Sequence, residues 1–378
     1  MLIENVSRRD LLKLGAAGAL SLALPRAAFA QQAAGPIVKP LPPEWFVNFG
    51  SNAEMRWDAA GDQGYLIDPT RFFVRNHTRT PAIDPATWRL KVFGNAVRKP
   101  LELSYRQLEK LACDSETAFI ECAGNGRSFF GTQQGTPASG TQWKLGAVGV
   151  ARWRGVRLRE VLERAGLRRA AVDVLPAGLD DEYVSGGVNY GHVRRPLPVG
   201  KALDDALIAL EMNGKELPPD HGFPARLVVP GWIGVANIKW LGSIEVADTA
   251  LSTPFNTTFY PGLTRQNVKS AFELPWDAQL TAGQRQVLHG RAWSGHAPIR
   301  KVDVSTDGGV SWRRARLHGP NLRNAWVRWE LPWTPPAGRH ELLARATDRT
   351  GLTQPDTVDF NPAGYGFWAV VRHPVTAV

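Results

Sequence analysis

The sequence predicts an α+β protein in which a mixed α/β domain is followed by an all-β domain, behind an N-terminal signal segment. Three observations support this prediction. A short apolar run lies within residues 1–30, short strands and helices alternate with many Gly and Pro residues through residues 31–265, and residues 266–378 carry only short alternating strands. Roughly 350 residues follow the signal segment, which is enough for two domains that each bury a core.

Residues 1–30 have the form of a twin-arginine signal peptide. Ser7-Arg8-Arg9-Asp10-Leu11-Leu12-Lys13 precedes an apolar run from Leu14 to Leu24, and Ala28-Phe29-Ala30 supplies a cleavage site. The run is shorter than the roughly 20 residues of a membrane-spanning helix, and no later stretch approaches that length, so we expect a soluble mature protein with no membrane span. This export route carries folded proteins to the periplasm, which favours a redox or metal enzyme that receives its cofactor before export.

The elements of the first domain are mostly short. Residues 31–70 are rich in Pro, Trp and Asn, which predicts an extended arm. Ser104 is expected to cap a helix that ends at Leu111, and a second helix is expected over residues 155–165. Strands are predicted at residues 72–77, 88–92, 171–175, 227–229 and 238–246. The loops between them are where we expect a functional site.

The second domain shows alternating apolar and polar residues over short runs. Asp307-Gly308-Gly309 predicts a hairpin turn within it. Strands are predicted at residues 286–293, 299–305, 326–331 and 340–347. This pattern is typical of an immunoglobulin-like β-sandwich.

The charge of the chain argues against nucleic-acid binding. Without the signal peptide, Lys and Arg fall from 45 to 41 and Asp and Glu from 35 to 33, which leaves a formal charge of +8. The basic residues are scattered, and no zinc-finger or helix-turn-helix pattern is present. An anionic substrate or an acidic partner fits this distribution better.

Cys122 is the residue with the most distinctive surroundings. It lies between an apolar strand, Phe119-Ile120-Glu121, and a Gly-rich turn that contains Arg127, so backbone N–H groups and a guanidinium would favour its thiolate. A thiolate can act as a nucleophile, as a ligand of a soft metal or as half of a disulfide. The other cysteine is Cys113, so a buried thiol and a Cys113–Cys122 disulfide are both open alternatives. No Cys-x-x-Cys-His haem motif is present, so electrons would have to leave through another protein.

The segment Cys122-Ala123-Gly124-Asn125-Gly126-Arg127 resembles the molybdenum-binding segment of the sulfite oxidase family of molybdopterin enzymes. Further segments resemble motifs of this family and occur in the family's order: residues 73–77 (FVRNH), Trp143 with 146–153, residues 211–214 (EMNG), 220–231 and 239–241 (KWL). The sandwich resembles the family's dimerisation domain, so the resemblance covers most of the mature chain.

The resemblance implies roles for individual residues. Cys122 would be the protein ligand of molybdenum, which suits a soft sulfur donor beside the pterin dithiolene, and Cys113 would be a core thiol. The residues that would hold the pterin and its phosphate are Asn76, His77, Asp180, His221, Arg226, Asn237 and Lys239. Arg75 and Arg127 would bind the substrate, Trp143 would shape the pocket, and Tyr260, placed by its distance from His221, would donate a hydroxyl.

The sequence departs from the family pattern at two places. Gly126 replaces an Arg that is common in the family, and Asn361-Pro362-Ala363-Gly364-Tyr365 lacks an Arg found in some animal members. Both changes reduce the positive charge of the substrate pocket, so they bear on the substrate more than on the cofactor. The chain also lacks a haem domain, and therefore resembles bacterial members that pass electrons to a separate c-type cytochrome.

Together these observations predict a periplasmic sulfite dehydrogenase that carries molybdenum-molybdopterin and no haem in this chain, and that oxidises sulfite to sulfate. The expected partners are a small sulfur oxyanion, a c-type cytochrome, and a second copy of the chain or a cytochrome subunit. One alternative is the same cofactor acting on a carrier-bound sulfane, a sulfoxide or nitrate. An alternative of another class is a non-enzymatic periplasmic binding protein.

Overall fold

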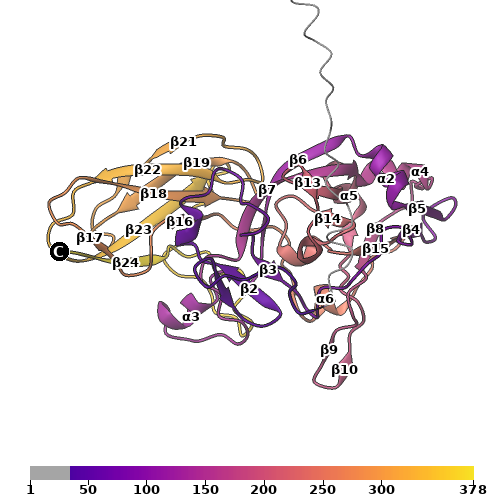
Figure 1. The fold of residues 1–378 in the computed structure, drawn as a ribbon, viewed down its shortest axis with the longest axis horizontal. Helices are drawn as coiled ribbons and strands as arrows, with labels where there is room; N and C mark the ends of the chain where they lie inside the picture. The colour runs from indigo at the N-terminus through magenta and orange to yellow at the C-terminus, as the bar shows by residue number, and fades with distance from the viewer. Residues whose placement is uncertain (1–34) are drawn as a thin grey trace, which may run out of the picture.

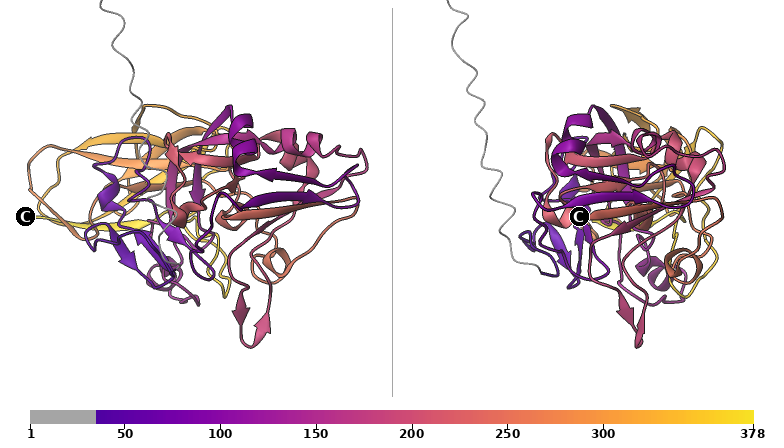
Figure 2. Two further views of the ribbon diagram at one scale, coloured as in Figure 1. Left: turned by 45° about the vertical axis from the view of Figure 1, so that its right-hand side comes forward. Right: turned by 90° about the vertical axis from the view of Figure 1, so that its right-hand side faces the viewer.

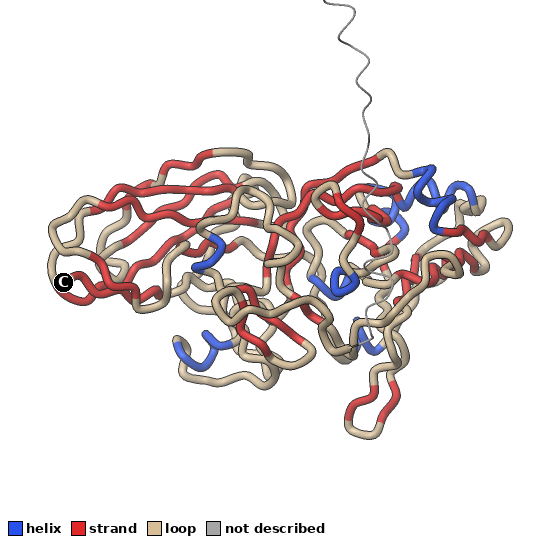
Figure 3. Tube along the Cα trace, viewed as in Figure 1, coloured by secondary structure: helices blue, strands red, loops and turns tan. Residues whose placement is uncertain are grey.

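The structure, a computed structural model, describes residues 35–378, so the predicted signal peptide at 1–30 lies outside the described residues. The chain forms an elongated molecule in which the mixed α/β domain lies at one end and the all-β domain at the other (Figure 1). Strands make up most of the lobe that carries the C-terminus (Figure 3), and no helix among the described residues follows Thr257. Within residues 35–378, no helix is long and apolar enough to cross a membrane.

Two larger sheets organise the first domain. The first has the order β11 (Leu197–Pro198), β8 (Asp173–Gly178), β15 (Leu241–Ala247), β4 (Arg89–Phe93) and β5 (Leu101–Ser104). The second has the order β13 (Lys215–Glu216), β12 (Leu207–Met212), β7 (Val148–Arg157) and β6 (Asp114–Glu121), and β14 (Arg226–Val228) also pairs with β12. Both sheets share one core with the helices α2 (Tyr105–Leu111), α4 (Leu158–Arg164) and α5 (Val199–Asp204).

Smaller elements surround these sheets. A three-stranded sheet is formed by β1 (Phe46–Asn48), β2 (Asn52–Met55) and β3 (Val74–Arg75). The hairpin of β9 (Val184–Ser185) and β10 (Val188–Asn189) projects from the body of the domain (Figure 2). Short helices complete the domain: η1 (Asp58–Ala60), α3 (Ser128–Thr132), η2 (Pro219–His221), η3 (Gly234–Ala236) and α6 (Pro254–Thr257).

Two predicted helices have different outcomes. Ser104 caps α2 as expected, because its hydroxyl accepts a hydrogen bond from the Gln107 N–H and the Gln107 side chain accepts one in return. The helix predicted at 155–165 is wrong in its first turn, since residues 155–157 complete strand β7 and α4 begins at Leu158. A Cβ atom on Gly155 would lie 1.9 Å from the Ile208 carbonyl oxygen, so the glycine allows β7 and β12 to approach closely.

Two facing sheets form the second domain. One has the order β16 (Lys269–Phe272), β18 (Gln286–Trp293), β22 (Val327–Trp333) and β21 (Arg316–His318). The other has the order β17 (Ala278–Leu280), β24 (Arg372–Ala377), β23 (Gly338–Asp348), β19 (Ile299–Ser305) and β20 (Arg313–Arg314). Leu288 and Trp329 from one sheet share a core with Val302 and Ala344 from the other. The second domain is therefore a two-layer sandwich.

The two domains share an apolar core. Trp57 of the first domain packs against Trp293 and Trp326 of the second, with ring centroids 5.7 and 6.1 Å apart. The Tyr65 hydroxyl donates to the Trp326 carbonyl at 2.7 Å, and the Trp326 indole donates to the Tyr65 carbonyl at 2.8 Å. The sandwich is consequently packed onto the first domain and is not merely tethered to it.

A buried ion pair crosses the same boundary. The Lys269 ammonium lies 2.6 Å from Oε1 of Glu121, whose side chain is fully buried. Oε1 also accepts from the Asn125 amide at 2.9 Å, and Oε2 accepts from the Trp293 indole at 2.9 Å. A carboxylate buried this deeply is tolerated because both of its oxygens are paired.

We predict that Lys269→Met lowers the free energy of unfolding by about 3–5 kcal/mol, because it leaves the Glu121 carboxylate buried without its cation. Urea denaturation of both proteins at pH 7 measures the difference. Arg314→Met is the matched control, since it removes an exposed partner of Asp303 and is expected to cost less than about 1 kcal/mol. Equal losses in the two variants would contradict the prediction.

Candidate active site

A pocket with about 730 Å³ of empty space, part of it open to solvent, lies in the first domain where the ends of several strands meet. It is called the cavity below. Its walls come from the end of β3, the turn after β6, the segment after β8, the region from η2 to Trp240 and the loop after α6. The predicted site residues among its lining are Arg75, Asn76, His77, Cys122, Asp180, His221, Arg226, Asn237, Lys239 and Tyr260. The structure therefore brings together ten side chains that are spread over 186 positions of the sequence.

The turn that holds Cys122 is fixed by hydrogen bonds. The Cys122 N–H donates to the Ala147 carbonyl at 2.9 Å, and the Gly124 N–H points to the Cys122 Sγ at 3.4 Å. The Asn125 side chain accepts from the Ala147 N–H at 3.1 Å and donates to Glu121. The thiol, 8% exposed, thus faces the cavity from a rigid turn with an N–H group beside it.

Two predictions for the cysteines are wrong: the Cys113–Cys122 disulfide and the core position of Cys113. Cys113 and Cys122 are both free, so no disulfide joins them. Cys113 is also exposed, where a core thiol was expected. It lies in the connection between α2 and β6, where its Sγ is 3.7 Å from Oδ2 of Asp114, beside a charged side chain and not in an apolar core.

One part of the cavity is strongly cationic. The Arg226 guanidinium donates to the carbonyls of His221 at 3.0 Å and Asn237 at 3.2 Å, while its Nε is buried with no partner among residues 35–378. The Lys239 ammonium donates to the Asp220 carbonyl at 2.8 Å and to the Asn76 side chain. Burial lowers the pKa of Arg226 to about 9 and that of Lys239 well below its usual value. Such enclosed cations suit a phosphate.

Asp180 supplies a hydrogen-bond acceptor to the same cavity that holds the cationic side chains. Its Oδ1 is buried and lacks a hydrogen-bond partner within the described part of the chain. Burial raises the pKa of this carboxyl to about 6, because it penalises the charged form. A buried acceptor that faces a cavity suits a ligand with ring N–H donors.

Arg75, His77 and Tyr260 form a third group. The Tyr260 hydroxyl lies 3.2 Å from the His77 Nε2 and accepts from the Arg75 guanidinium at 3.4 Å. Burial, together with the positive charges of Arg75 and Lys239, lowers the pKa of His77 well below its usual value, so this imidazole is neutral at pH 7. Arg75 is therefore the positive charge of this group, and Tyr260 is its hydroxyl donor.

Three of the predicted site residues serve mainly to support the site. Arg127 and Trp143 lie outside the cavity lining, behind Gly124, where a Cβ atom would meet them at 2.8 and 3.1 Å. The Arg127 guanidinium donates to the carbonyls of Ala363 and Thr141, both at 2.8 Å. Asn237 lines the cavity, but its side chain accepts from the Val229 N–H at 2.8 Å and donates to the Ile233 carbonyl at 3.2 Å. A substrate-binding role for Arg127 stays a prediction.

Sequence reasoning missed three residues that build the site. The Tyr365 ring stacks on Tyr260, with centroids 4.8 Å apart, and its segment was noted only for a missing Arg. The Asp220 carboxylate accepts from the backbone N–H groups of Val38 at 3.0 Å and Lys39 at 2.8 Å, which anchors the N-terminal arm. The Lys39 ammonium lies 3.5 Å from the His221 ring. A lone Lys in a Pro-rich arm carries no signal for this contact.

Comparison with known proteins identifies the class of the fold. The oxidoreductase molybdopterin binding domain matches residues 77–255, and the Mo-co oxidoreductase dimerisation domain matches residues 263–371. The chain is therefore an oxidoreductase with a molybdopterin-binding domain and a dimerisation domain.

Individual relatives narrow this class to a family. The chain is 36% identical to sulfite oxidase of Gallus gallus over 324 residues, which cover 78% of this chain and 69% of that protein. It is 35% identical to mitochondrial sulfite oxidase of Rattus norvegicus over 325 residues. The crystal structure of the sulfane dehydrogenase SoxCD from Paracoccus pantotrophus superposes with a TM-score of 0.75 at 28% identity, over 89% of this chain and 86% of that one. The chain belongs to the sulfite oxidase family of molybdopterin enzymes.

The cavity fits the cofactor of this family. The unpaired Asp180 Oδ1 and Arg226 Nε are a buried acceptor and a buried donor that a pterin with a phosphate can satisfy, and Cys122 would supply a soft sulfur ligand for molybdenum. The matched region spans 58% of the length of the rat sulfite oxidase, so the activity of the whole relative comes to this chain only as a proposal.

We predict that Lys39 makes the stability of the enzyme depend on pH. Although the residue as a whole is half-buried, its ammonium is enclosed, and burial lowers its pKa from 10.5 to about 7 against the opposing charges of Asp220 and Asp68. Between these two pKa values the unfolded chain holds a proton that the folded chain has released, so the contribution of Lys39 to the free energy of unfolding rises with pH. Below the folded-state pKa of about 7, Lys39 is charged in the folded chain as well, so the folded state bears the full free-energy cost of burying this charge.

Lys39→Met removes this contribution, so its free energy of unfolding is expected to rise less steeply with pH than that of the wild type from about pH 7 to pH 10. Urea denaturation at several pH values measures both slopes. Lys99→Met, at an exposed lysine, is expected to follow the wild type. Parallel curves for Lys39→Met and wild type would contradict the assignment.

Proposed function

We propose that this enzyme oxidises sulfite to sulfate and passes the electrons to a c-type cytochrome. The observation that carries the proposal is the convergence of the Arg75 guanidinium and the Tyr260 hydroxyl in the cavity that also contains the Cys122 thiol. A positive fork and a hydroxyl donor are the groups that bind and orient a small oxyanion. The similarity to sulfite oxidases over 78% of the chain supports this choice of substrate.

The reaction adds one oxygen atom from water to sulfite and releases two protons and two electrons. The molybdenum cofactor, when bound, supplies the two-electron oxygen-transfer chemistry. Cys122 would ligate the metal, while Arg226, Lys239 and Asp180 would hold the pterin and its phosphate. The protein's own contribution is to fix the anion beside this group and to limit the access of water.

Three residues have separate roles at the proposed substrate site: Arg75, His77 and Tyr260. Arg75 binds the oxyanion and offsets its charge. The neutral His77 ring beside the Tyr260 hydroxyl fixes the direction in which that hydroxyl points, and it adds no charge that would compete with Arg75. Stacking on Tyr365 holds the Tyr260 ring in place.

The second candidate is the same cofactor acting on a sulfane sulfur compound. The likeness to the sulfane dehydrogenase SoxCD favours it over a sulfoxide. The missing arginines at Gly126 and in residues 361–365 agree with a substrate less dependent on positive charge than free sulfite. Membership of an oxidoreductase family argues against a non-enzymatic binding protein.

Further parts of the proposal concern assembly and location. We propose that the sandwich is immunoglobulin-like and pairs two subunits, because the family's dimerisation domain matches residues 263–371. We also propose export of the folded enzyme to the periplasm, supported by Arg8 and Arg9 and the apolar run that follows them.

The first experiment makes two measurements on periplasmic and cytoplasmic fractions. Elemental mass spectrometry gives the molybdenum content, and a spectrophotometric assay gives the sulfite-dependent reduction of cytochrome c. Wild type is expected to hold about one molybdenum per chain in the periplasmic fraction, and Cys122→Ser is expected to lose activity roughly a hundredfold or more, since it removes the metal ligand. Cys113→Ser, at the exposed cysteine, is the control and should keep both properties.

The possible outcomes separate the parts of the proposal. Full activity of Cys122→Ser would contradict the metal site. Molybdenum without sulfite oxidation would move the substrate to another sulfur compound, and activity confined to the cytoplasmic fraction would contradict export alone.

Arg75→Met tests the substrate site. We expect the KM for sulfite to rise roughly ten- to a hundredfold with unchanged molybdenum content, because a hydrogen bond to a charged group is worth about 1.5–3 kcal/mol. Steady-state kinetics measure it. Arg79→Met removes a nearby arginine that pairs with Asp181 at the surface, and its KM should match the wild type. An unchanged KM in Arg75→Met would exclude Arg75 from sulfite binding.

A further inference from the structure

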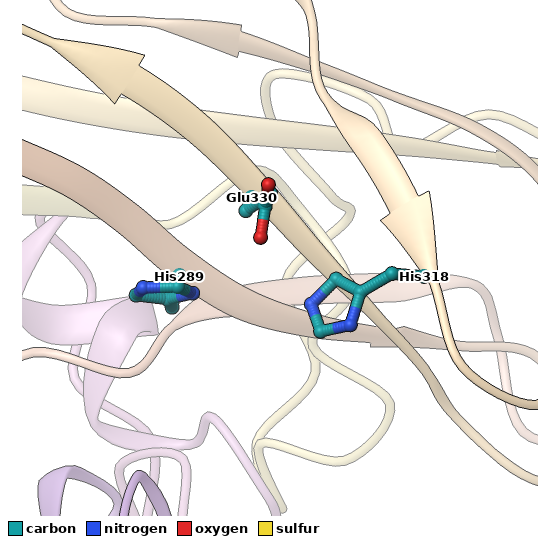
Figure 4. Close-up of side chains that lie close together, drawn as sticks. All are labelled: His289, His318 and Glu330. Carbon is teal, nitrogen blue, oxygen red and sulfur yellow. The ribbon is translucent and has the colours of Figure 1, made fainter.

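Two histidines and a carboxylate gather on one face of the sandwich. His289 lies on β18, His318 on β21 and Glu330 on β22, and their side chains converge (Figure 4). One potential ligand atom from each residue lies within 4.8 Å of the other two. None of the three residues lines the cofactor cavity, so this cluster is separate from the active site.

The register of the strands produces this cluster. His289 pairs directly with Glu330, and His318 pairs with Arg328, two positions from Glu330. Side chains that are directly opposite or diagonal on one face of an antiparallel sheet lie within reach of each other. The alternate positions, Leu288 and Trp329, face the core, so the three side chains project from the outer face.

Two atoms of the cluster are available to bind a ligand. The Nε2 of His318 is buried and has no hydrogen-bond partner among residues 35–378. Arg316 donates from Nε at 2.9 Å and from Nη2 at 2.5 Å, and both hydrogen bonds end on Oε1 of Glu330, which leaves Oε2 for another ligand. Arg328 has its acidic partner elsewhere, with Glu273 at 4.0 Å.

We propose that His289, His318 and Glu330 bind one divalent transition-metal ion, with zinc as the cation that suits this donor set. Two imidazoles and a carboxylate are ligands that zinc accepts in tetrahedral geometry, and three protein ligands leave one position open. In tetrahedral geometry, zinc to nitrogen or oxygen bonds of roughly 2.0–2.2 Å place the ligand atoms roughly 3.4 Å from one another. The three ligand atoms lie within 4.8 Å of one another, so small side-chain rotations bring them to that spacing. The unpartnered His318 Nε2 gains a bond in the process.

The test uses untagged, molybdenum-loaded enzyme that has been freed of loosely bound divalent cations with a chelator. Isothermal titration with zinc chloride and elemental analysis after dialysis measure affinity and stoichiometry. Wild type is expected to bind about one zinc per chain, and His289→Ala and His318→Ala are each expected to weaken binding roughly tenfold or more. His340→Ala, which removes a histidine from the other sheet of the sandwich, is the matched control.

Arg316→Met is expected to change the affinity for zinc in the opposite direction. It removes a positive charge beside the site and frees the Glu330 carboxylate, so zinc affinity should rise severalfold, whereas Glu330→Gln should lower it. Zinc binding that is equal in wild type and in the His289→Ala/His318→Ala double variant would overturn the proposal. Because molybdenum content and sulfite oxidation are measured on the same samples, failure of the zinc site is distinguishable from failure of the proposed function.

Discussion

The buried Glu121 carboxylate is the constraint on which the active site depends. Glu121 directly precedes Cys122, and three side chains of the C-terminal region fix its position. The Lys269 ammonium and the Trp293 indole pair with the carboxylate. The Gln266 amide donates to the Glu121 backbone carbonyl at 2.7 Å. The strand that ends at Cys122, the proposed metal ligand, is thus positioned by residues outside the cofactor-binding domain. Both domains therefore contribute to the position of the Cys122 sulfur.

The C-terminal segment reinforces the same turn from another side. The Gly366 N–H donates to the Ala123 carbonyl at 2.8 Å, and the Arg127 guanidinium donates to the Ala363 carbonyl at 2.8 Å. Tyr365 lies between them and stacks on Tyr260. Residues close to the end of the chain therefore support the side of the cavity that contains Tyr260, and they also hold the Arg127 guanidinium.

The sequence predicted best those features that local chemistry determines. The strands predicted at 286–293 and 299–305 have these bounds in the structure, and the helix after Ser104 was predicted correctly from its cap. The first turn of the helix predicted at 155–165 failed because pairing between β7 and β12 overrides local preference. The resemblance to the family identified ten of the cavity-lining residues, seven of them within its motifs. Lys39 and Tyr365 reach the site only through contacts with segments far along the chain.

The electrostatics of the cavity couple folding to cofactor binding. Arg75, Arg226 and Lys239 lie together there, and burial lowers the pKa of Arg226 and Lys239 because enclosing a positive charge costs free energy. An anionic cofactor that pairs with these groups offsets that cost and binds the folded chain only, so it adds its binding free energy to stability. The unpaired Asp180 oxygen acts in the same direction through hydrogen bonding. The polar residues that line the cavity thus make the fold most stable once the cofactor is in place, which is the order of events that the proposed export of a folded enzyme requires.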